Sequence, residues 1–137
     1  MSIDLNNPEV KFAMEIARTA GEVAQNIQAS MDVTGVEKKD LSPVTVADFS
    51  CQAIVARALK LQFPNAQLVG EEDSGVLREA GQEEVLATVT KYVKTIVSDA
   101  TDDLVCAWID GGNDEPSDRF WTLDPIDGTK GYLRGEQ

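Results

Sequence analysis

Apolar residues recur at helical spacing in two long segments of the chain. In the first, apolar positions three and four residues apart follow Asn7 and Pro8, a good N-cap residue before a proline. This pattern predicts a helix over about residues 8–30. In the second, apolar residues at the same spacing predict a helix over about residues 82–98. Both stripes are typical of a packing face.

A third apolar stripe lies between these two helices. It follows Thr45, which has Asp48 three residues later, as in a capping box with aspartate in place of the usual glutamate or glutamine. The stripe predicts a helix that ends near Phe63, before a proline. Residues 31–42, which precede it, combine a glycine with a charge cluster and predict a loop.

Three short apolar runs are typical of strands. They are Gln67–Val69, Leu104–Ile109 and Phe120–Leu123, and residues 110–113 between the last two read as a turn. Carboxylates follow the first and the last of these runs directly, as Glu71-Glu72-Asp73 and as Asp124. Because ligands bind near strand ends in α/β proteins, we expect these acidic groups to lie at a site.

Residues 124–129 carry the densest chemistry. Asp124 and Asp127 lie three residues apart around a proline that stiffens the turn, so both carboxylates can face one cation. Magnesium prefers oxygen ligands, and the main-chain carbonyl of Ile126 offers another. A helix starting at Gly128-Thr129 would direct its free amides at an anion. A phosphate beside a metal ion is a coherent interpretation of this stretch.

Composition narrows the chemistry further. The chain has 137 residues, the length of one domain, and no histidine, which excludes histidine-dependent nucleophiles and imidazole zinc sites. A net charge of −12 argues against a nucleic-acid partner. We expect Cys51 and Cys106 to be buried free thiols, and no P-loop or dinucleotide fingerprint is present. With no targeting pattern or apolar span, we expect a cytoplasmic protein without a membrane partner.

Each acidic group also has an ordinary structural explanation. Asp48 fits a helix cap, Glu71-Glu72-Asp73 fits a solvated acidic loop, and the segment from Asp124 to Asp127 fits a simple turn. These alternatives stay open for each group taken alone. Their joint occurrence beside strand ends favours a common site.

The motifs together resemble a known family. GEEDS at 70–74 and WTLDPIDGTKGYLRGEQ at 121–137 are similar to the inositol monophosphatase superfamily of metal-dependent, lithium-sensitive phosphatases. Within it, SPVTVAD at 42–48 and DGTKGYLRG at 127–135 resemble the 3'(2'),5'-bisphosphate nucleotidase branch. The resemblance implies an α+β layered sandwich of the sugar-phosphatase type. It also implies that residues 1–137 are the N-terminal, metal-binding α/β portion of such a domain, with the C-terminal portion absent.

The resemblance implies a role for each matching residue. The Mg²⁺ ligands it implies are all oxygen donors: Glu71, Asp124, Asp127 and the carbonyl of Ile126. Asp48 and Thr129 would orient and deprotonate the attacking water, and the amides of Gly128 and Thr129 would hold the substrate phosphate.

The implied reaction is hydrolysis of adenosine 3',5'-bisphosphate to AMP and phosphate. Two alternatives remain: a phosphatase of inositol phosphates, and a catalytically inactive, truncated metal-binding or interaction module. A half-built layer would leave an exposed sheet edge and an apolar face, which predicts self-association through that edge.

Overall fold

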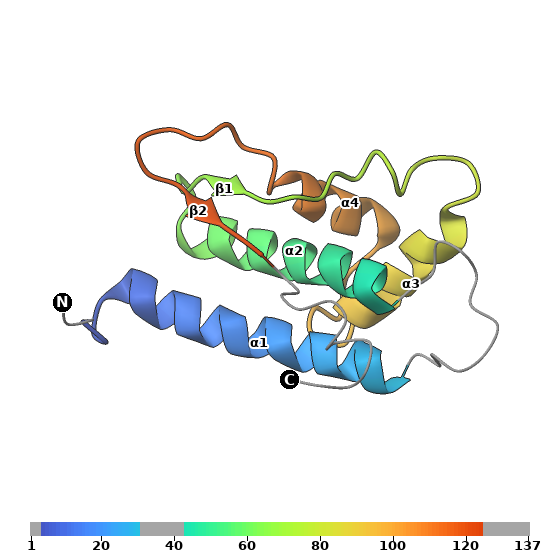
Figure 1. Ribbon diagram of the computed structural model, residues 1–137, viewed down its shortest axis with the longest axis horizontal. Coiled ribbons are helices and arrows are strands. Elements are labelled where there is room, and N and C mark those ends of the chain that lie inside the picture. Colours follow the sequence, from blue (N-terminus) through green and yellow to red (C-terminus); the bar gives the residue numbers. More distant parts are fainter. Residues whose placement is uncertain (1–3, 31–42, 125–137) are drawn as a thin grey trace.

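The computed structural model describes residues 4–30 and 43–124, so the predicted loop over residues 31–42 lies outside the described residues. The described chain forms, in order, α1 (Pro8–Ser30), α2 (Pro43–Gln62), β1 (Leu68–Val69), α3 (Glu83–Val93), α4 (Asp102–Asp110) and β2 (Trp121–Thr122). Helices α1 and α2 lie side by side and run in opposite directions (Figure 1).

Helix α1 has the predicted bounds because its start is capped as the sequence indicates. The Asn7 side-chain oxygen accepts hydrogen bonds from the main-chain N–H of Glu9 at 2.8 Å and of Val10 at 3.4 Å. These bonds satisfy two of the amides that a helix start leaves unpaired. The buried residues of α1 are Phe12, Val23, Ala24 and Ile27, and they lie on the face toward α2.

Helix α2 is the centre of the fold, because it packs against α1, α3 and α4. It begins at Pro43, so the predicted capping box is wrong: Thr45 lies inside the first turn and Asp48 inside the second. The main core lies where the four helices meet. Its members from α2 include Val46, Phe49 and Ala53, which are 5% exposed or less.

Helix α4 replaces the strand predicted at Leu104–Ile109, so that prediction is wrong. Thr101 caps the helix, because its side-chain oxygen accepts a hydrogen bond from the Leu104 N–H at 3.2 Å. Val105 and Ile109, four residues apart, are both fully buried in the main core. The helix predicted over residues 82–98 is also shorter than expected, since α3 ends at Val93.

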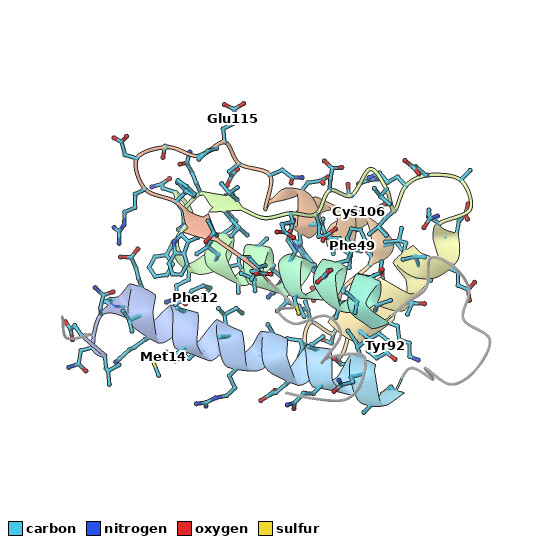
Figure 2. All side chains as sticks on the ribbon, in the orientation of Figure 1. Phe12, Met14, Phe49, Tyr92, Cys106 and Glu115 are labelled. Atoms are coloured by element: carbon cyan, nitrogen blue, oxygen red, sulfur yellow. The ribbon has the colours of Figure 1, made fainter. Side chains whose placement is uncertain are left out.

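The strands form a two-stranded parallel sheet in which Leu68 pairs with Trp121 and Val69 with Thr122. A second cluster of apolar side chains, including Phe12 and Leu68, lies between this sheet, α1 and α2. Phe12 contacts Trp121 edge to face, with ring centroids 5.7 Å apart. Figure 2 shows Phe12 on the side of α1 toward β2, and Met14 on the opposite side.

The described residues are therefore mainly helical, with little sheet. We expected an α+β layered sandwich. One parallel strand pair with helices packed against it is the part of that arrangement present in the described segments. Within the same segments, no helix combines the length and the apolar character needed to cross a membrane.

Candidate functional site

The two strands end at the same edge of the sheet, because they run parallel. Val69 lies opposite Thr122, and Glu71 and Asp124 each follow two residues after these strand ends. Each residue was predicted from the sequence to follow a strand end, and the structure places both there. The parallel pairing is what brings together two carboxylates that are far apart in the sequence.

Helix α2 supplies a third predicted residue, Asp48, to the same place. Burial, together with the negative charges of Glu72, Glu71 and Asp124, raises the pKa of Asp48 from 3.8 to about 6. These contributions place Glu72, Glu71 and Asp124 each within electrostatic range of Asp48. The acidic groups of α2, of the segment after β1 and of the segment after β2 therefore form one cluster.

Burial and the charge of Glu71 also raise the pKa of Glu72. Within the described ranges, no salt bridge involves any of the four carboxylates of the cluster. Oxygen donors that repel one another are the donor set of a hard divalent cation, which would relieve the repulsion. The oxygen donors present therefore suit a hard divalent cation.

Four predicted site residues lie outside the described residues: Ile126, Asp127, Gly128 and Thr129. Among residues 4–30 and 43–124, no three acidic or cysteine side chains are close enough together to hold a metal ion by themselves. The roles assigned to residues 126–129 remain predictions.

Gln52 is a residue of this region that the sequence analysis missed. It lies on α2 one turn after Asp48, and its side chain is fully buried. Its amide oxygen accepts from the Glu72 N–H at 3.0 Å, and its amide nitrogen donates to the Glu72 carbonyl at 2.8 Å. The signal for it was a single large polar residue inside an otherwise apolar stripe.

A second anchor holds the far end of the acidic segment. The Asp110 carboxylate, at the end of α4, accepts from the Ser74 N–H at 2.9 Å and from the Ser74 hydroxyl at 2.6 Å. The Asp73 carboxylate accepts from the Gly75 N–H at 2.6 Å, which forms a local turn. The segment 70–75 is thus fixed to α2 at one end and to α4 at the other, which distinguishes it from a freely solvated acidic loop.

The two cysteines are free thiols, and both are buried, as predicted. Burial first, and the charge of Asp48 second, raise the pKa of Cys51 to about 12. A thiol with so high a pKa is not a nucleophile at neutral pH. Cys51 is therefore a packing residue behind the carboxylate cluster.

Comparison with known proteins identifies the family. The sequence profile described as the inositol monophosphatase family matches residues 5–137, and the chain belongs to this family. A rice (Oryza sativa) 3'(2'),5'-bisphosphate nucleotidase is 42% identical over 153 aligned residues, which cover 100% of this chain and 43% of that protein. An Arabidopsis thaliana 3'(2'),5'-bisphosphate nucleotidase 1 is 42% identical over 94% of this chain and 40% of the relative.

A third relative, 3'(2'),5'-bisphosphate nucleotidase 2 of Candida albicans, is 49% identical over 73% of this chain and 31% of that protein. The chain thus spans less than half the length of the curated relatives that it matches. The resemblance to this superfamily and branch, stated from the motifs, is confirmed.

Proposed function

We propose that this chain carries the carboxylate part of a magnesium-dependent phosphatase site that hydrolyses the 3'-phosphate of adenosine 3',5'-bisphosphate. The observation that carries the proposal is the meeting of Asp48, Glu71 and Asp124 at one edge of the sheet. The substrate class is taken from the relatives, which are named 3'(2'),5'-bisphosphate nucleotidases.

Magnesium would be held by four oxygen donors: Glu71, Asp124, Asp127 and the carbonyl of Ile126. When bound, the ion supplies positive charge that offsets the phosphate and favours ionisation of a nearby water. The chain's own residues do the rest of the positioning. The amides of Gly128 and Thr129 would hold the phosphate, and Thr129 together with Asp48 would orient the attacking water.

The proposed reaction is a single in-line displacement. The water oxygen forms a bond to phosphorus while the bond from phosphorus to the 3'-oxygen breaks, giving AMP and inorganic phosphate. Asp48 accepts one proton of the water, and the leaving 3'-oxygen takes up a proton from solvent to become the 3'-hydroxyl of AMP.

The state of the two cysteines bears on the compartment of the protein. Cys51 and Cys106 are unpaired, and free cysteines are the rule where thiols are kept reduced. We place the protein in the cytoplasm.

The test is phosphate release from adenosine 3',5'-bisphosphate with magnesium, with and without lithium. We expect lithium-sensitive release that is lost in Asp127→Asn and kept in Asp99→Asn, a change at an exposed aspartate outside the cluster. Inositol 1-phosphate serves as the second substrate, and faster release from it would replace the nucleotide assignment. Magnesium binding without release from either substrate would leave a metal-binding module.

A further inference from the structure

Gln52 joins α2, which carries Asp48, to the acidic segment after β1 and to the end of α4. It lies four residues after Asp48, so both side chains are on the same face of α2. Its hydrogen bonds reach the segment that carries Glu71 and the end of α4. We propose that Gln52 is a positioning residue that fixes Glu71 relative to Asp48, an inference that rests on the metal site of the proposed function.

The side-chain amide of Gln52 pairs with the main chain of Glu72 as a neighbouring strand would. One side-chain amide accepts from the Glu72 N–H at 3.0 Å and donates to the Glu72 carbonyl at 2.8 Å. Both main-chain groups of Glu72 are therefore paired to a rigid helix. Because Glu71 is the adjacent residue, two fixed bonds at Glu72 restrict the direction in which the Glu71 carboxylate points.

The same amide nitrogen also donates to the carbonyl of Ile109, at 2.7 Å. Ile109 is in the last turn of α4, so a single side chain connects α2, α4 and the acidic segment. The amide has one oxygen and two N–H groups, and the three bonds use all of them. Glutamate, methionine or leucine at this position would lose at least one of the bonds.

Two glycines make room for this side chain. A Cβ atom on Gly70 would overlap the Gln52 amide oxygen, and a Cβ atom on Gly112 would lie 2.6 Å from its amide nitrogen. The three nearest atoms at both positions all belong to Gln52. The Gly70 N–H donates to the Gly112 carbonyl at 2.6 Å, which holds the two glycines together beneath the amide. The site thus needs glycine at 70 and 112 because the Gln52 amide occupies the space that a Cβ atom at either position would take.

A role in folding alone does not account for this arrangement. A buried amide must recover its lost hydration through hydrogen bonds, and an apolar core residue of the same shape is often as stable. Two of the three bonds of Gln52 go to Glu72, the residue beside a proposed ligand, and the third goes to Ile109 of α4. Positioning predicts a change in metal affinity, whereas a folding role predicts a change in stability alone.

The experiment is titration of the 137-residue chain with MgCl₂ by isothermal calorimetry. We expect Gln52→Met to weaken magnesium binding by about 10- to 100-fold, the range for residues that orient metal ligands. The matched control is Thr90→Val, which removes another buried polar group that bonds a carboxylate, Asp102, at 2.6 Å between α3 and α4. The control should lose stability and keep its magnesium affinity.

A second test displaces the Gln52 amide through a neighbouring residue and leaves Gln52 itself in place. Gly112→Ala should weaken binding as Gln52→Met does, while Gly21→Ala, whose Cβ would meet nothing within 4 Å, should not. Unchanged affinity in a folded Gln52→Met protein, or in Gly112→Ala if the first variant fails to fold, would overturn the role of Gln52. Magnesium binding by the unmodified chain without phosphate release would overturn the phosphatase activity and leave this role standing.

Discussion

Two carboxylate sites lie at the two ends of strand β1. They differ in whether a cation of the protein neutralises them. At the start of the strand, Asp114 accepts from the Leu68 N–H at 3.0 Å and forms a salt bridge with Lys60. The hydrogen bond from Lys60 lowers the pKa of Asp114, and burial only partly opposes it. At the end of the strand, burial and neighbouring acidic groups raise the pKa of Asp48 to about 6.

The difference separates a structural carboxylate from a functional one. Asp114 has its cation within the protein, since the Lys60 ammonium that pairs with it also donates to the Ala66 carbonyl at 2.7 Å. The cluster around Asp48 lacks such a partner among the described residues, and its repulsion persists in the folded chain. Such a cluster is stabilised by binding a cation from solution.

The largest effect should come from removing a proposed ligand. We expect Glu71→Gln to weaken magnesium binding by more than the roughly 100-fold that orienting residues cost. Because one negative charge leaves the cluster, the metal-free variant should be as stable as the unmodified chain, or more so. Calorimetric titration and thermal unfolding in EDTA measure the two quantities.

The control for that change is Glu115→Gln, at an exposed position on the outer loop before β2 (Figure 2). It should alter neither quantity. A Glu71→Gln protein that is markedly less stable without metal would contradict the comparison, because it would make Glu71 a structural carboxylate like Asp114.

A smaller effect is expected at the other end of the strand. Lys60→Met leaves the half-buried Asp114 carboxylate without its cation, and should lower the free energy of unfolding by about 1–2 kcal/mol at pH 7. Magnesium affinity should stay within about twofold of the original, since the pair is at the opposite end of β1. Urea denaturation and calorimetry test both statements.

Lys94→Met, at an exposed lysine after α3, is the matched control and should be nearly neutral. A large loss of magnesium affinity in Lys60→Met would show that the Asp114 pair and the cluster around Asp48 are coupled through the strand and are not independent.

The sequence could predict elements where the signal was local. The Asn7 cap and the regular stripe behind it located α1, and short apolar runs that ended in acidic residues located both strands. The apolar run at residues 104–109 led to the wrong prediction of a strand, because a short buried helix and a buried strand have similar compositions. Only Thr101, followed by acidic residues in the first turn, indicated the helix.

The candidate site was predicted residue by residue from the sequence, and the roles of those residues stay predictions. Asp48, Glu71 and Asp124 each stood out by position and charge, yet only the parallel pairing of β1 with β2 brings the last two together. Gln52 could not be assigned from the sequence, because its partners at Glu72 and Ile109 are 20 and 57 residues away. Long-range hydrogen bonds leave no periodic trace in a sequence.

The smallest effect is the pH dependence of stability in EDTA. The folded-state pKa of Asp48 is raised from 3.8 to about 6, so the folded chain holds this proton more tightly than the unfolded chain. Its contribution to stability is present below pH 3.8 and is lost as the pH rises through about 6. Asp114, whose pKa is lowered, contributes in the opposite sense, and its contribution is lost only in more acidic solution. Urea denaturation between about pH 4.5 and 7.5 should therefore show a weaker decline in Asp48→Asn than in the unmodified chain and the exposed-site variant Asp99→Asn, with the rest of the decline due to Glu72, whose pKa is also raised. An unmodified chain whose stability rises across that window would mean that Asp48 is compensated as Asp114 is, and that the two ends of β1 do not differ.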